Sequence, residues 1–306
     1  MIRMLLAALL ALSLVGCQRG TGPAGSPAAA PAASAPEPTA PPQSASSRDQ
    51  VQIEYRVYGD KPLAVVLIHG WSCDSRYWRA QVGALAATYT VVTLDLAGHG
   101  ASGGNRSAWT MQAYGEDVAA VVRHLSNQRV VLVGHSMGGP VALEAAALLG
   151  DRVAGVIGVD TFRSIGLPLP PRAQVEHQIE PFRTNFVAAM HAFVPRYLFT
   201  PHADASLVRQ VTDEMSREPP AVAVASLDSL NALDFSALLP RIHVPILAIN
   251  SDLGGITDAE RIRKSVPGFQ VITLPGDGHF LMLEDAQRFN QILQRELATF
   301  AASLPR

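Results

Sequence analysis

Short, continuous apolar runs recur along the chain, separated by stretches whose apolar positions recur at helical spacing. An unbroken apolar run such as 63–68 or 153–159 is typical of a strand covered on both faces of a sheet. Strands are expected at 51–58, 63–68, 90–94, 130–133, 153–159, 245–250 and 269–274. Helices are expected at 74–87, 110–125, 141–148 and 258–265. This alternation predicts a mostly parallel central sheet with helices on both faces.

The alternation stops between residues 161 and about 240. Prolines at 168, 170, 171, 181 and 195 divide this region into short helical pieces. The pieces carry the aromatic residues Phe182, Phe186, Phe193, Tyr197 and Phe199. We expect most of these rings to pack within the inserted region and the others to line an apolar acyl or alcohol pocket.

The N-terminal 50 residues have a different composition from the rest. Residues 1–17 combine Arg3 with an apolar run too short to span a bilayer, and end in Leu-Val-Gly-Cys17. This ending resembles the lipobox of bacterial lipoproteins, in which the cysteine is lipidated; an ordinary secretory peptide cleaved nearby is the alternative. Gln18, rather than Asp, directly follows this cysteine, which resembles the signal that sorts lipoproteins to the outer membrane. Residues 18–50, rich in Ala, Pro and Ser, are predicted to be a disordered tether, which leaves 51–306 as the folded domain.

Composition excludes several other classes. The chain has 306 residues, 48% of them hydrophobic, and a net charge of -2, so nothing favours a nucleic-acid partner. If Cys17 carries lipid, Cys73 has no partner for a disulfide. The sequence contains no His-Glu-x-x-His and no paired cysteine motif, so no metal site is expected. We expect a monomer whose contact with the membrane is through the N-terminal lipid.

One motif indicates a catalytic function. It is Gly134-His135-Ser136-Met137-Gly138, between the strand 130–133 and the helix 141–148. A serine on a tight strand-to-helix turn is held out of the sheet, and the flanking glycines let the neighbouring backbone approach closely. The first amides of the following helix point toward the place where an oxyanion would form. The motif therefore predicts a nucleophilic serine.

With its flanking elements, this motif resembles the nucleophile elbow of the α/β-hydrolase superfamily, with Ser136 as nucleophile. The resemblance covers roughly residues 51–303 and implies that 161–240 is a helical cap inserted after the sixth strand. It also implies an oxyanion hole formed by the backbone N–H groups of Trp71 and Met137, with His69 as a loop residue bonded to backbone. His279, in a Gly-rich loop after the last strand, stands where the superfamily has its general base.

The sequence offers three candidates for the acid that orients His279. Asp252 follows the strand 245–250, which corresponds to the superfamily's seventh strand, where the commonest members have the acid, and is our first assignment. Its surroundings depart from the usual Gly-x-x-Asp pattern, so Asp160, after the strand 153–159 that corresponds to the sixth, is the alternative. Asp258 is a weaker third choice because it resembles a helix N-cap.

The segment 98–103 has the spacing Gly-x-Gly-x-x-Gly after a strand, as in dinucleotide sites. No apolar helix begins inside it and no acidic residue ends a strand about 20 residues later, so no cofactor is expected. The same residues resemble a loop that shapes the pocket rim in α/β-hydrolases.

These features predict a serine hydrolase that cleaves a carboxylic ester or thioester through an acyl-enzyme on Ser136. The superfamily also includes lactonases, C–C hydrolases and cofactor-free haloperoxidases, and some members serve as ligand receptors without turnover. Sequence alone leaves these alternatives open. The expected location is the bacterial envelope, at the outer membrane facing the periplasm.

Overall fold

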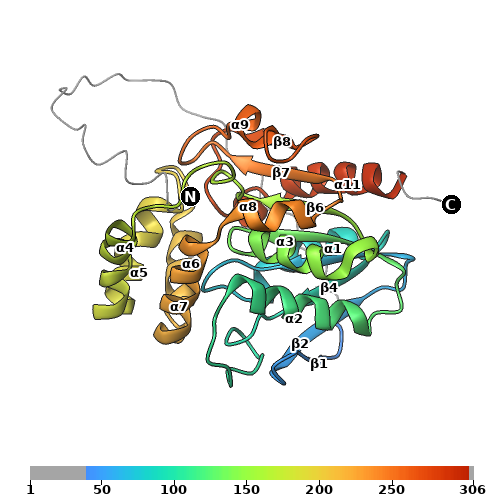
Figure 1. The fold of residues 1–306 in the computed structure, drawn as a ribbon, viewed down its shortest axis with the longest axis horizontal. Helices are drawn as coiled ribbons and strands as arrows, with labels where there is room; N and C mark the ends of the chain where they lie inside the picture. Colours follow the sequence, from blue (N-terminus) through green and yellow to red (C-terminus); the bar gives the residue numbers. More distant parts are fainter. Residues whose placement is uncertain (1–38, 303–306) are drawn as a thin grey trace, which may run out of the picture.

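Eight strands form one sheet within residues 39–302, which are the residues that the computed structural model describes (Figure 1). The strands are β1 (Gln43–Ser46), β2 (Gln52–Tyr58), β3 (Leu63–Ile68), β4 (Thr90–Leu94), β5 (Arg129–His135), β6 (Val153–Val159), β7 (Ile246–Ser251) and β8 (Gln270–Leu274). Their order is β1-β2-β4-β3-β5-β6-β7-β8. β2 pairs antiparallel with β1 and β4, and all other pairs are parallel. The predicted mostly parallel sheet is confirmed.

Helices cover the sheet because its central strands are apolar on both faces. Every residue of β3 and β6 is buried, as the unbroken apolar runs predicted. α2 packs on α3, and α1 packs on α11 (Figure 1). The helical elements outside the cap are η2 (Ser75–Trp78), α1 (Arg79–Leu85), α2 (Met111–His124), α3 (Gly138–Leu149), η3 (Gly150–Arg152), α8 (Phe235–Leu238), η4 (Leu239–Arg241), α9 (Ala259–Arg263), α10 (Leu281–Glu284) and α11 (Ala286–Ala302).

Four helices between β6 and β7 form the cap, which lies at one end of the molecule, on the left in Figure 1. They are α4 (Arg172–Thr184), α5 (Phe186–Tyr197), α6 (Ala205–Met215) and α7 (Pro220–Ala232). The insertion was expected at this point in the chain. Pro181 and Pro195 lie within the last turn of α4 and α5 rather than between helices.

The folded part begins earlier than the sequence indicated. The predicted tether, 18–50, includes β1, which pairs with β2 at the edge of the sheet. Beyond β1, the buried Ser47 donates a hydrogen bond to Asp117 (Oγ to Oδ1, 2.6 Å). The tether boundary at residue 50 was therefore wrong, because backbone pairing orders a segment of linker-like composition. The predicted signal peptide, 1–17, and Cys17 lie outside the described residues.

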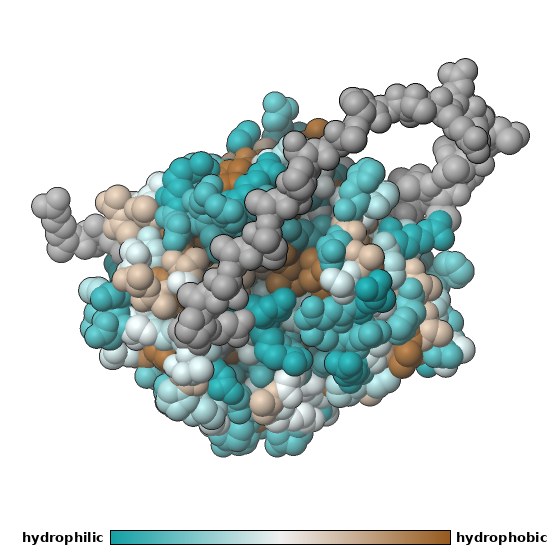
Figure 2. Space-filling model, turned by 180° about the vertical axis from the view of Figure 1, so that it is seen from behind, coloured by the Kyte–Doolittle hydropathy of each residue, from teal (hydrophilic) through white to brown (hydrophobic). Residues whose placement is uncertain are grey.

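The surface seen in Figure 2 is largely hydrophilic, with separate hydrophobic patches. Leu169, Val187 and Ile256 are the large hydrophobic side chains that remain exposed among residues 39–302. In the same residues no single helix has the length and apolarity to cross a membrane. Only the pair Pro220–Ala232 and Phe235–Arg241, bent by 73°, meets those criteria, by length and composition alone.

Candidate active site

Ser136 lies at a sharp turn between β5 and α3, as the motif predicted. Its φ is 51°, a left-handed conformation that a non-glycine residue rarely adopts. A Cβ at Gly134 would lie 2.1 Å from the Gly138 carbonyl oxygen, and one at Gly138 would lie 2.5 Å from the Ile68 oxygen. Both positions therefore require glycine, and the tight turn holds Ser136 at the carboxyl edge of the sheet.

His279 lies in the loop between β8 and α10 and is buried. Its Nδ1 is 2.6 Å from Oδ2 of Asp160 and donates a hydrogen bond to it. Its backbone N–H donates to the carbonyl of Leu198 (2.8 Å), which belongs to the cap. His279 is thus held through Nδ1 of its imidazole and through its backbone N–H. Its Nε2 is left to exchange a proton during a reaction.

The acid beside His279 is Asp160, so the first assignment, Asp252, does not fit the structure. Asp252 is exposed and accepts a hydrogen bond from the Gly276 amide (2.9 Å), which ties two loops together. Asp258 caps α9 by accepting from the Arg261 amide (3.0 Å). Asp160 instead directly follows β6, at a φ of 48°, and is almost completely buried.

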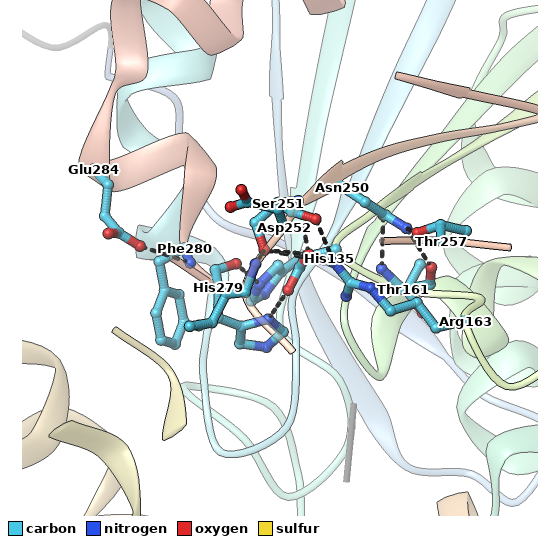
Figure 3. A network of polar contacts seen from close by, with 12 residues as sticks. His135, Thr161, Arg163, Asn250, Ser251, Asp252, Thr257, His279, Phe280 and Glu284 are labelled. Carbon is cyan, nitrogen blue, oxygen red and sulfur yellow. Dashed lines mark hydrogen bonds and ion pairs between the residues drawn. The ribbon is translucent and has the colours of Figure 1, made fainter. Parts of the chain in front are cut away.

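The end of β7, where we expected the acid, holds Asp160 in place. Figure 3 shows Asn250 and Ser251 at this strand end, beside Arg163 and His279. Ser251 donates to Oδ1 of Asp160 from both its backbone N–H and its hydroxyl, each at 2.9 Å. Arg163 donates to the same oxygen at 2.8 Å and to the Ser251 carbonyl at 2.6 Å. Asn250 accepts from the Thr161 amide and donates to its carbonyl, each at 3.0 Å, which fixes the turn after Asp160.

These contacts determine the charges at the site. Burial alone would raise the pKa of Asp160, but the hydrogen bonds and positive charges of His279 and Arg163 hold that pKa well below its usual value. Burial lowers the pKa of His279, and the bond to Asp160 offsets only part of that effect. At neutral pH the pair is therefore a carboxylate and a neutral imidazole, the state in which His279 can accept a proton.

The two predicted oxyanion donors flank this turn. Met137 is the residue just before α3, and Trp71 follows β3; both are buried. Within residues 39–302, neither backbone amide donates a hydrogen bond to another group of the protein. His69 donates from Nδ1 to the Gly70 carbonyl (2.8 Å) and accepts from the Leu96 amide (3.0 Å), which confirms its expected role as a backbone-bonded loop residue.

Three residues that support the site were not identified from sequence. His135 donates from Nε2 to the carbonyl of His279 (3.0 Å). Glu284 accepts from the amides of Gly278 and Phe280, on either side of His279, at 3.1 Å each. Arg163 completes the set through Asp160. The only available signal was their position, because His135 lies inside the motif and Arg163 lies three residues after a candidate acid.

A cavity of about 80 Å³ joins Ser136, Asp160 and His279. Trp71, Phe193, Asn231 and Phe280 also line it, so its wall is formed partly by the cap. No hydrogen bond in the described part of the chain joins the Ser136 hydroxyl to His279. Such bonds are often long in unliganded enzymes and tighten with substrate.

Cys73 also lines this cavity, as a buried free thiol that donates to the Trp71 carbonyl (3.3 Å). Burial raises the pKa of this thiol well above its usual value, so it is not a nucleophile at neutral pH. Among residues 39–302, no three His, Cys, Asp or Glu side chains are grouped so that they could hold a metal ion.

Residues 65–292 match the alpha/beta hydrolase family. The chain belongs to this family. It is 31% identical over 264 residues to the dihydrolipoyllysine-residue acetyltransferase component of the acetoin cleaving system of Pseudomonas putida, a match that covers 82% of this chain and 67% of that protein. It is 28% identical over 271 residues to the bifunctional esterase/perhydrolase DCH of Acinetobacter calcoaceticus, which covers 81% and 96% respectively.

Solved structures agree with this assignment. A thermophilic esterase from Thermogutta terrifontis superposes with a TM-score of 0.74 at 25% identity, covering 85% of this hydrolase and 99% of the esterase. The enol-lactonase of Burkholderia xenovorans LB400 superposes with a TM-score of 0.73 at 21% identity, covering 84% and 100%, which shows a shared fold. The protein is thus an alpha/beta hydrolase, and its esterase relatives support ester hydrolysis as its general activity.

Proposed function

We propose that the protein is a serine hydrolase that cleaves carboxylic esters or thioesters through an acyl-enzyme on Ser136. The observation that carries the proposal is the 2.6 Å contact between His279 and Asp160, in the cavity that Ser136 lines. A base oriented by a buried carboxylate beside a serine on a strained turn is the arrangement that activates a hydroxyl for acyl transfer.

In the first half-reaction, Ser136 Oγ attacks the substrate carbonyl carbon while His279 Nε2 takes the hydroxyl proton. The amides of Trp71 and Met137 donate to the resulting oxyanion. When the bond to the leaving group breaks, His279 gives its proton to the departing alcohol or thiol. Asp160 stays ionised and stabilises the imidazolium, as its depressed pKa requires.

In the second half-reaction, a water molecule attacks the acyl carbon and His279 takes its proton. Collapse of the second oxyanion breaks the bond to Ser136, which regains the proton from His279. The products are a carboxylic acid and an alcohol or thiol. The enzyme needs no cofactor for either step.

We also propose that the enzyme is anchored by lipid on Cys17 at the outer membrane, facing the periplasm. The lipobox-like sequence before Cys17 and the choice of Gln18 support this location. Several acyl chains, each buried methylene contributing about 0.8 kcal/mol, would anchor the protein without a membrane-spanning helix. Replacing Cys17 by serine should move the protein from the membrane fraction to the soluble fraction.

The test of the activity is hydrolysis of p-nitrophenyl acetate, butyrate, octanoate and palmitate by the wild-type protein and by Ser136→Ala. We expect turnover that depends on Ser136, together with labelling of Ser136 by a fluorophosphonate probe. Labelling without turnover of any ester would contradict the proposed activity and favour a receptor. A folded protein that the probe does not label would exclude Ser136 as an activated nucleophile.

A further inference from the structure

A second, larger cavity of about 330 Å³ lies within the cap, between α4, α5 and α7. Its walls are mainly apolar and include Ile179, Phe182, Ala189 and Leu227. His177, Arg196 and Ala192 also line it and are exposed, so the cavity opens at the cap surface. A mainly apolar cavity of this size, with a polar rim, fits a hydrocarbon chain whose far end reaches solvent.

The cap cavity adjoins the catalytic cavity. Trp71, Phe193 and Asn231 line both, so they form the boundary between them. A chain attached to an ester at Ser136 could therefore pass from one cavity to the other along these three side chains. Each methylene it buries stabilises binding by about 0.8 kcal/mol.

Trp71 contributes different groups to the oxyanion hole and to the cap. Its backbone amide is one of the two oxyanion donors, whereas its side chain extends into the cap. The indole Nε1 donates to the carbonyl of Ala223 in α7, at 2.7 Å. The indole also meets the ring of Phe182 edge-on at 5.4 Å and that of Phe193 at 6.3 Å. The position of the oxyanion amide is thus linked to the packing of the cap.

We propose that the cap cavity binds an apolar chain of the ester substrate, and that Trp71 couples its occupancy to the oxyanion hole. This inference rests on the proposed esterase function and adds a substrate class to it. A chain in the cavity packs against the indole, the contacts of Trp71 tighten, and the backbone amide is held where the oxyanion forms. Because an oxyanion donor acts on the transition state, filling the cavity raises kcat as well as lowering KM.

The experiment compares the full-length wild-type protein with Trp71→Phe on two ester series. One series varies the acyl chain of p-nitrophenyl esters from acetate to decanoate, and the other varies the alcohol of alkyl acetates from ethyl to octyl. In the wild type, kcat/KM should rise about fourfold per methylene along the series whose chain enters the cap. Part of that rise should appear in kcat.

Trp71→Phe keeps an aromatic ring but removes the hydrogen bond to Ala223. We expect KM still to fall with chain length, while kcat becomes independent of it. Trp109→Phe makes the same chemical change outside both cavities and should keep the wild-type dependence of kcat. The coupling is refuted if chain length changes only KM in the wild type, or if the rise in kcat persists in Trp71→Phe.

A binding measurement tests the cavity without catalysis. By calorimetry, Ser136→Ala should bind decanoate more tightly than butyrate if the acyl chain enters the cap, or 1-octanol more tightly than ethanol if the alcohol chain does. Ala189→Trp, which fills the cap cavity, should remove the difference. Equal affinity within both pairs would overturn the proposed chain site even if esters are hydrolysed. Chain-dependent binding without hydrolysis of any ester by the wild type would instead refute the proposed function and leave the chain site supported.

Discussion

Replacing Asp160 by asparagine tests the assignment of the catalytic acid. Oδ1 of Asp160 accepts three hydrogen bonds, from Arg163 and from the amide and hydroxyl of Ser251, whereas from the residues that the structure describes Oδ2 accepts only the bond from His279. The asparagine side chain has one oxygen and one NH₂ group. Its oxygen will remain with the three donors, because the reverse orientation would place the NH₂ group against the N–H groups of Arg163 and Ser251, which can only donate.

The NH₂ group then faces Nδ1 of His279. Two donors cannot bond, so the imidazole must adopt the other tautomer, with Nδ1 accepting and Nε2 protonated. A protonated Nε2 cannot take the hydroxyl proton of Ser136. A wrong tautomer costs roughly 10⁴ in kcat, equivalent to about 5.4 kcal/mol of transition-state stabilisation.

The assay is steady-state hydrolysis of a p-nitrophenyl ester, with urea unfolding measured on the same samples. Losing the carboxylate beside the buried Arg163 should also destabilise the fold, by about 1 to 3 kcal/mol. Asp252→Asn is the matched control, and its kcat should stay within about twofold because Asp252 is exposed and bonds only a loop amide. If Asp252→Asn abolishes turnover and Asp160→Asn keeps more than a tenth of it, the assignment is wrong.

Three further predictions concern pH and packing. Because burial lowers the pKa of His279, the acidic limb of the kcat/KM profile should lie below pH 6.5; a limb above pH 7 would contradict the buried neutral imidazole. Burial raises the pKa of Glu218 to about 8, whereas an unfolded glutamate titrates near ~4.3, so the folded state keeps a proton that the unfolded chain loses. Stability in urea should therefore decrease as pH rises from about 5 to 8, and Glu218→Gln should flatten that part of the curve; an unchanged slope would contradict it. Gly138→Ala should prevent folding or lower the free energy of unfolding by more than about 3 kcal/mol, because the added Cβ would lie 2.5 Å from a backbone oxygen. A variant whose urea unfolding curve matches that of the wild type would refute this steric argument.

The position of the acid also connects the catalytic residues to the cap. Asp160 directly precedes the chain segment that enters the cap, and Arg163 lies on that segment. His279 donates its backbone N–H to Leu198 at the end of α5. Asp160 and His279 are thus both bonded to residues of the segment between β6 and β7.

Local sequence determined the parts of the site that depend on a few adjacent residues. Gly134 is required within the five-residue motif itself, because a Cβ there would meet the carbonyl oxygen of Gly138, and the apolar run before it specifies a buried strand. Gly138 marks the same turn in the sequence, but its Cβ is excluded by Ile68 of a neighbouring strand. The helix after the motif was equally clear. His279 could be located because the resemblance to α/β-hydrolases places the base in the loop after the last strand, and this histidine lies there.

Tertiary structure alone decided the acid and the start of the domain. Asp160 and Asp252 both follow buried strands, and what separates them is the bonding of one to Ser251, which is distant in sequence, and to His279. β1 is ordered by backbone hydrogen bonds to β2, and these do not depend on side-chain composition. The role of Asp160 is set by partners distant along the chain. β1 pairs with the next strand, but through backbone groups that its own side chains do not specify, so local sequence carries little signal for either feature.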